Sequence, residues 1–314
     1  MATMRNYSRR LFLAGLGSLV ATACSQGKAS SPGERVTTPM LAGDGPVDTP
    51  TPLPVRQSTS APTATPISLR SRNAAQRMLM PGTPWQTPLS VRSSGIRGPV
   101  VMILGGVHGN EPGGWTAAET VAAWEPSAGE LLVVPRANIT AISSYVRTWD
   151  EIGDLNRLYP GDSSSSFAME RMAAEIVATA REFEVDVLLD MHESWAFYAE
   201  YPVGGGTGAL GQTITAGAGP RQAALGQAIA ARVNPQISGR EQMIVRDGNA
   251  FRRPDVTPAA GQTTRGRSSL AIGGHVPGLT PVLVEMGQEN QALVRRVDLH
   301  LIVARTLLEI VGVL

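Results

Sequence analysis

Cysteine is nearly absent from the 314-residue sequence, in which Cys24 is the only one. A single cysteine excludes both a disulfide within the chain and a zinc site built from thiolates. Charge is sparse as well, since 17% of the residues are charged and the formal net charge is +1. This balance gives no reason to expect nucleic-acid binding. Any metal site must therefore use histidine and carboxylate side chains.

Two further absences limit the function. The sequence contains no Gly-x-Ser-x-Gly nucleophile elbow, which argues against a serine hydrolase of that type. The apolar stretch over residues 11–23 is too short for an ordinary membrane span. It follows a basic start made by Arg5, Arg9 and Arg10, and this order is typical of a signal peptide.

The signal segment carries two more specific features. Residues 8–13 resemble a twin-arginine export signal, and residues 20–24 resemble a bacterial lipoprotein cleavage site that ends at Cys24. We therefore expect a signal peptide over residues 1–24, lipid attachment to Cys24, and anchoring on the outer face of a bacterial cell membrane. The alternative is an ordinary signal peptide that happens to contain a cysteine.

The composition changes after residue 24. Residues 25–90 are rich in Pro, Ser and Thr and have too little apolar surface to offset the entropy of ordering, which predicts a disordered tether. Residues 91–314 alternate short apolar runs with amphipathic stretches, as in an α/β domain with a buried, largely parallel sheet. The predicted strands are residues 99–104, 131–135, 185–191 and 281–286. The predicted helices are residues 115–124, 166–183, 221–232 and 291–311.

Three of the apolar runs end in residues that can bind or assist a metal. The first leads into His108 and Glu111, the second into His192, and the third into Glu285. Because ligands of open α/β sheets bind beyond the carboxyl ends of the strands, these residues would converge if the strands are neighbours. Two histidines and one glutamate are a common ligand set for catalytic zinc. Alone, either histidine would be interpreted as structural.

Other side chains fall into supporting positions. Asp190 lies two residues before His192, so in a strand both point to one face, and Asp190 can orient the imidazole. A role in capping nearby backbone is the alternative for Asp190. Glu193 would point away from the metal, and we expect it to face solvent. Glu285 follows an apolar run and would serve as a general base beside a metal-activated water, or else form a strand-end salt bridge.

A long loop over residues 138–161 contains Arg147, Asn156 and Arg157, which indicate an anion site. Residues 204–220 are glycine-rich and are predicted to be a loop. Residues 234–277 give weak signals of either kind, and we expect them to shape the substrate site.

Four blocks in this order resemble the zinc carboxypeptidase superfamily, in its succinylglutamate desuccinylase/aspartoacylase branch. The blocks are Gly-x-His-Gly-Asn-Glu (106–111), Asp-Leu-Asn-Arg-x-x-Pro-Gly (154–161), Asp-x-His (190–192) and Val-Glu-Met-Gly (284–287). The resemblance implies a mixed, mainly parallel sheet with helices on both faces. It also implies one Zn²⁺ ion held by His108, Glu111 and His192.

The resemblance further implies roles for the remaining side chains. Glu285 would be the catalytic carboxylate, Arg147 would polarise the scissile carbonyl, and Asn156 with Arg157 would bind a substrate carboxylate. Peptide-cleaving members carry a tyrosine before the catalytic glutamate, and here His275 is a candidate for that role, although a histidine in a turn is the favoured interpretation.

The expected function is hydrolysis of an amide bond near a carboxylate, in an N-acyl amino acid or a peptide. The alternative is a surface lipoprotein that binds peptides or acyl amino acids without turnover.

Overall fold

The computed structural model describes residues 74–201, 208–246 and 268–314. Cys24, the predicted signal peptide and most of the predicted tether lie outside the described residues. None of the described helices is long and apolar enough to cross a membrane. The described residues contain five α-helices and an eight-stranded sheet.

The strands are β1 (Ala74–Leu79), β2 (Thr87–Ser93), β3 (Val100–Gly105), β4 (Glu130–Val134), β5 (Val187–Ser194), β6 (Thr213–Ala216), β7 (Ile244–Arg246) and β8 (Thr280–Gly287). The α-helices are α1 (Pro112–Val121), α2 (Ile139–Ser144), α3 (Ala168–Glu182), α4 (Pro220–Val233) and α5 (Leu293–Val311). Short 3₁₀ turns are η1 (Leu155–Arg157), η2 (Tyr198–Glu200), η4 (Asn234–Gln236), η5 (Gly239–Glu241) and η7 (Ser269–Gly274).

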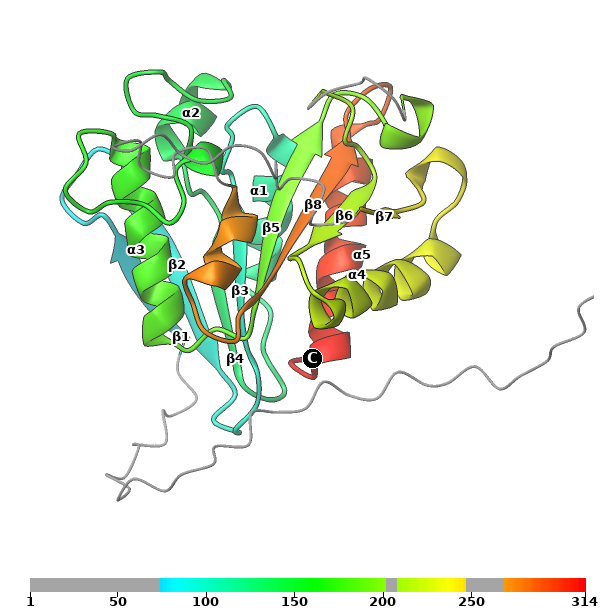
Figure 1. Cartoon of the computed structure of the whole chain (residues 1–314), viewed down its shortest axis with the longest axis horizontal. Coiled ribbons are helices and arrows are strands. Elements are labelled where there is room, and N and C mark those ends of the chain that lie inside the picture. The colour runs from blue at the N-terminus through cyan, green and yellow to red at the C-terminus, as the bar shows by residue number, and fades with distance from the viewer. Residues whose placement is uncertain (1–73, 202–207, 247–267) are drawn as a thin grey trace, which may run out of the picture. The chain divides into compact units, whose positions relative to one another are not determined.

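The sheet has the strand order β1-β2-β4-β3-β5-β8-β6-β7 (Figure 1). Its centre is parallel, because β4, β3, β5 and β8 all run in one direction. The antiparallel pairs lie toward the two edges, where β1 pairs with β2, β2 with β4, and β6 with β8. This arrangement is the mixed, mainly parallel sheet that the resemblance implies. All four predicted strands are present and adjacent.

Helices cover both faces of the sheet. On one face, Val101 and Ile103 of β3 pack with α1, α4 and α5 in one apolar cluster. On the other face, Met102 and Leu104 pack with α3 and η7 in a second cluster. The alternation of consecutive β3 residues between the clusters follows the two-residue period of a strand. A strand buried on both faces explains why β3 is uninterrupted by polar residues.

The predicted tether extends too far along the chain. β1 lies inside residues 25–90 and β2 begins there, and Leu79 and Leu89 are buried in the second cluster. Both strands are short and interrupted by polar residues, so no long apolar run marks this hairpin in the sequence. Pairing with β4, rather than local composition, gives the hairpin its backbone partners in the sheet. The described fold therefore begins at residue 74.

Two predicted loops also contain regular structure. β6 lies within residues 204–220, where its four buried residues pair with β8. A strand of four residues within a glycine-rich segment is too short to give a recognisable apolar pattern in the sequence. α2 and η1 lie within residues 138–161, and Asn138 caps α2 by accepting a hydrogen bond from the backbone N–H of Ala141. Within residues 234–277, the structure describes β7, η4, η5 and η7, while residues 247–267 lie outside the described part.

Candidate metal centre

The loop that leaves β3 carries two of the predicted ligands. It turns at Gly106, which has φ +69°, and reaches Glu111 directly before α1 begins at Pro112. Gly109 packs against the backbone of α2, and a Cβ atom there would lie 2.1 Å from the carbonyl carbon of Ala141. Glycine is therefore required where this loop meets α2. The close contact holds His108 and Glu111 on the same side of the loop.

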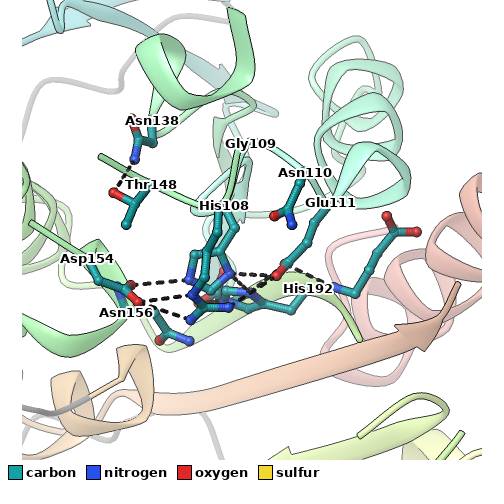
Figure 2. Close-up of polar contacts among 12 residues, drawn as sticks. His108, Gly109, Asn110, Glu111, Asn138, Thr148, Asp154, Asn156 and His192 are labelled. Carbon is teal, nitrogen blue, oxygen red and sulfur yellow. Dashed lines mark hydrogen bonds and ion pairs between the residues drawn. The ribbon is translucent and has the colours of Figure 1, made fainter. Parts of the chain in front are cut away.

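The three predicted ligands meet at the carboxyl ends of β3 and β5. Figure 2 shows His108, Glu111 and His192 converging, and their ligand atoms all lie within 4.8 Å of one another. Glu111 Oε1 is 2.6 Å from His108 Nδ1, and Glu111 Oε2 is 2.8 Å from His192 Nδ1. The two Nδ1 atoms are 3.2 Å apart. All three side chains are buried, with exposures of 2%, 6% and 1%.

This geometry fits a divalent metal of the zinc type. A tetrahedral zinc ion with bonds of about 2.0–2.1 Å to nitrogen keeps its ligand atoms about 3.3 Å apart. The separation of 3.2 Å between the two Nδ1 atoms agrees with that spacing. Two imidazole nitrogens and one carboxylate are also a donor set that zinc accepts readily. The group of His108, Glu111 and His192 could thus hold one metal ion.

A carboxylate lies behind each imidazole. His192 Nε2 is 2.9 Å from Asp190 Oδ2, as the spacing along β5 predicts. His108 Nε2 is 3.2 Å from Asp154 Oδ1, a partner that sequence reasoning missed (Figure 2). A ring that donates from Nε2 to a carboxylate presents Nδ1 as an acceptor toward a metal. Asp154 is the first residue of the 154–161 block, which was the only signal for it in the sequence. Its partner His108 lies in a different loop, so the contact could not be predicted.

These contacts also set the charge states. Burial alone would lower the pKa of His192, but the carboxylates of Asp190 and Glu111 raise it well above its usual value. Burial would raise the pKa of Glu111, yet the two imidazoles hold it well below its usual range. Burial also opposes ionisation of Asp154, whose pKa is nevertheless lowered by the hydrogen bond to His108 and the charge of Arg147.

Arg147 lies at this centre. Its Nη2 and Nε atoms donate to Asp154 Oδ2 at 3.1 and 3.2 Å, and its Nη1 atom is 3.7 Å from Glu111 Oε1. The Arg147 side chain is 43% exposed, so one side of its guanidinium remains open to solvent. An arginine in this position can stabilise negative charge that develops beside the metal ligands.

The predicted carboxylate-binding pair lies in η1, next to Asp154. Asn156 is buried and its Oδ1 accepts a hydrogen bond from the backbone N–H of Ser269, which joins η1 to η7. Arg157 is exposed, and its Nη1 donates to the Asn156 carbonyl at 2.7 Å. The charge of Arg157 acts on Asp154 and helps to lower its pKa. Both side chains thus lie near the cluster, with only Arg157 open to solvent.

Glu285 lies on the strand next to His192. In the parallel pair β5–β8, Glu285 is the registered partner of His192, so both side chains point to the same face. Glu285 is 8% exposed, and its burial raises its pKa to about 7. The neighbouring imidazole of His192 acts in the opposite direction, while the charge of Glu111 raises the pKa further. A carboxyl group with this pKa can both accept and donate a proton near neutral pH.

Comparison with known proteins agrees with this arrangement. Residues 97–199, about a third of the chain, match the family model of the succinylglutamate desuccinylase/aspartoacylase catalytic domain. The matched segment is therefore similar to the catalytic domain of the succinylglutamate desuccinylase/aspartoacylase family. It contains His108, Glu111 and His192, whereas Glu285 lies outside it and is placed by the register of β8. The resemblance seen in the sequence is thereby confirmed.

Among curated proteins, the chain is similar to the N-alpha-acetyl-L-2,4-diaminobutyric acid deacetylase of Halomonas elongata, with 33% identity over 109 residues. This match covers 33% of the chain and 31% of the deacetylase, so the chain aligns with about a third of that relative.

Two solved structures show the same fold. An aspartoacylase family protein from Mesorhizobium loti matches with a TM-score of 0.54 and 19% identity, over 79% of the chain and 70% of that protein. The D,L-carboxypeptidase Csd4 of Helicobacter pylori, in its mDAP-bound form, matches with a TM-score of 0.53 and 18% identity, over 69% of the chain and 52% of Csd4.

One expectation about an individual residue is wrong, and one open alternative is decided. Glu193 does not face solvent: it is 4% exposed and forms an ion pair with Arg296 of α5. Strand alternation does turn it away from His192, but helices cover that face of the sheet too. His275 follows η7 and precedes β8, and its carbonyl accepts a hydrogen bond from Arg181 at the C-terminal end of α3. His275 is therefore a turn histidine before the start of β8, whereas the ligand cluster lies beyond the carboxyl ends of β3 and β5.

The raised pKa of His192 predicts a pH dependence of metal binding. In the metal-free protein the His192 imidazole is protonated at neutral pH, and a metal must displace that proton. The affinity for zinc should therefore increase with pH, by about tenfold per unit while the pH remains below the His192 pKa. Chelator competition between pH 6 and pH 8 measures this slope. A dissociation constant that stays the same across this range contradicts the assignment.

Proposed function

We propose that this protein is a zinc-dependent hydrolase that cleaves an amide bond close to a carboxylate of its substrate. The observation that carries the proposal is the convergence of His108, Glu111 and His192 beyond the carboxyl ends of β3 and β5, with Glu285 on the adjoining strand. Three protein ligands and a nearby carboxyl group are the parts that a metallohydrolase needs.

Each residue would contribute a defined chemical step. Held by His108, Glu111 and His192, zinc supplies Lewis acidity, which polarises a carbonyl oxygen and makes water more acidic. Glu285 takes a proton from the attacking water and passes it to the nitrogen of the leaving amine. Its pKa of about 7 is that of the metal-free protein, and the charge of a bound zinc ion would lower it, which favours the ionised carboxylate that accepts the first proton.

The arginines would bind and polarise the substrate. Arg147 is fixed by Asp154 and lies beside Glu111, so its guanidinium can stabilise the negative oxygen that forms during attack on the carbonyl. Arg157 can hold the substrate carboxylate through two parallel hydrogen bonds. Asn156 Oδ1 accepts a hydrogen bond from the Ser269 N–H, so Asn156 would orient the η1 turn, and its amide N–H groups would be its donors to a substrate carboxylate.

The substrate class rests on the relatives and on these charges. One relative is a deacetylase of an acetylated amino acid and another is a D,L-carboxypeptidase, and both names describe hydrolysis of an amide bond. Because the chain aligns with only part of each, the activity of the whole protein is a proposal. N-acyl amino acids and short peptides with a free carboxylate are the two classes to test.

We further propose that the protein is exported and anchored through a lipid on Cys24. The support is the arginine-rich start, the short apolar stretch and the position of the single cysteine directly after it. Such an anchor would place the hydrolase on the outer face of the membrane, where peptides and acylated amino acids from outside the cell are accessible.

The variant Glu285→Gln tests the mechanism. It keeps the shape of the side chain but removes the proton acceptor, so kcat should fall by about 10²- to 10⁴-fold while zinc still binds one to one. Steady-state amine release and metal analysis measure the two quantities. Glu309→Gln, an exposed change on α5, is the matched control. Full activity in Glu285→Gln would exclude this residue as the general base.

The variant Cys24→Ser tests the anchor. Removing the only thiol removes the attachment point for the lipid, so the protein should move from the membrane fraction to the soluble exported fraction. Incorporation of labelled fatty acid into the wild-type protein, and its loss in the variant, measures the modification directly. Equal labelling of both proteins would exclude Cys24 as the attachment point, and an unlabelled wild type would favour an ordinary signal peptide.

A further inference from the structure

A buried ion pair lies directly behind the ligand cluster. Arg296 Nη1 of α5 is 2.7 Å from Glu193 Oε2 of β5, and the two side chains are 10% and 0% exposed. Desolvation raises the pKa of Glu193, and Arg296 opposes that rise. Because burying two charges costs about as much free energy as their attraction returns, such a pair is weak evidence for stability alone. Its contacts show what else it does.

Glu193 contacts the metal ligand Glu111 through its backbone. The Glu193 N–H donates to Glu111 Oε2 at 3.0 Å, the same oxygen that lies 2.8 Å from His192 Nδ1. The Glu193 carboxylate accepts a hydrogen bond from the backbone N–H of Gly113 at 3.0 Å. Gly113 is the second residue of α1, which begins directly after Glu111. One residue therefore fixes both the Glu111 carboxylate and the helix start that follows it.

The Glu193 carboxylate is tightly packed by its neighbours. A Cβ atom on Gly113 would lie 2.2 Å from Glu193 Oε1, so only glycine fits beside the carboxylate in its present position. Gln288, which follows β8, donates from Nε2 to Glu193 Oε2 at 3.2 Å and to the carbonyl of Asn110 at 3.0 Å. Asn110 lies between His108 and Glu111. The carboxylate of Glu193 thus connects α1, α5 and the segment after β8 to the ligand loop.

A second ion pair on the same helix provides a comparison. Arg295, the preceding residue of α5, pairs with Glu241 at 2.6 Å. That pair is partly exposed, with side-chain exposures of 37% and 20%, and its members make no hydrogen bond to a ligand residue among the described contacts. Of these two adjacent arginines, only Arg296 pairs with a residue that is hydrogen-bonded to a proposed ligand among the described contacts.

We propose that the Glu193–Arg296 ion pair is a positioning element that holds Glu111 in the orientation needed to bind the metal. The inference rests on the proposed metal site and adds two residues that do not touch the metal. Arg296 Nη1 binds the Glu193 carboxylate on the side of α5 and keeps it directed at the Gly113 N–H. Without this pairing, the Glu193 carboxylate would release the start of α1, and Glu111, which directly precedes that helix, would shift relative to the Glu193 N–H and to His192.

Two variants of the full-length chain test the proposal by different routes. Glu193→Gln combined with Arg296→Met removes both charges together, so no single buried charge remains. Gly113→Ala keeps both charges but displaces the Glu193 carboxylate, and alanine is tolerated better than glycine within a helix. Arg295→Met is the matched control, because it breaks an ion pair on the same helix that does not reach the ligands.

The readouts are zinc affinity by chelator competition, the visible spectrum of the Co²⁺-substituted protein, and the melting temperature of the metal-free protein. Zinc affinity should fall by about 10- to 100-fold in both test variants, as for loss of a residue that orients a metal ligand. The cobalt spectrum should change in both, because it reports the geometry of the ligands. Arg295→Met should retain the wild-type affinity and spectrum.

Three outcomes would overturn the inference. Wild-type affinity and spectrum in either folded test variant would show that the pair only stabilises the fold. A lower melting temperature with an unchanged cobalt spectrum would lead to the same conclusion. A wild-type chain that binds neither zinc nor cobalt would reject the proposed function, and with it the positioning role.

Discussion

The central constraint of the structure is that the side chains of His108, Glu111 and His192 contact one another while buried from solvent. Two Nδ1 atoms 3.2 Å apart cannot both direct a proton at each other, so one must accept or both must face a cation. The carboxyl groups of Asp190, Asp154 and Glu285 surround the same rings. Arg147 balances part of this negative charge through Asp154, and a divalent ion at the three donor atoms would balance more of it.

The remainder of the site supports that contact. Parallel neighbours β3, β5 and β8 end at one edge of the sheet, which brings together residues that are far apart in sequence. Asp154 and Asp190 hold the rings from behind, and the Glu193–Arg296 pair holds Glu111 from the side of α1 and α5. The helices on both faces of the sheet exclude water from these charges, which strengthens each contact.

The sequence alone predicts the parts of this site that depend on local pattern. The apolar runs predict the four central strands. The polar residues at the ends of three of these runs are His108, Glu111, His192 and Glu285, which the sequence offers as candidates for the site. Asp190 follows from the two-residue period of β5. The structure brings these side chains together at the expected positions because a buried parallel strand has a strong sequence signal and a fixed direction, while their chemical roles stay predictions.

The parts that failed depend on contacts between distant segments. Asp154 contacts His108 only because the loop that contains η1 folds over the ligand loop, which no local pattern shows. Strand alternation turns Glu193 away from the ligands, which led to the expectation that it faces solvent. That expectation failed because α1 and α5 cover this face of the sheet. β1 is short and interrupted by polar residues, and β6 is short and lies in a glycine-rich segment. Pairing with β2 and β8, rather than their own composition, makes these segments strands.

The most direct test of the central claim is amine release by the zinc-loaded full-length chain from matched substrates. N-acyl amino acids and short peptides would be compared, each with a free and with an amidated carboxyl terminus. We expect cleavage in one class, with kcat/KM about 10- to 100-fold lower after amidation, because a charged hydrogen-bond partner of Arg157 is lost. Zinc bound one to one without product from any compound would contradict hydrolysis and favour a protein that only binds such ligands.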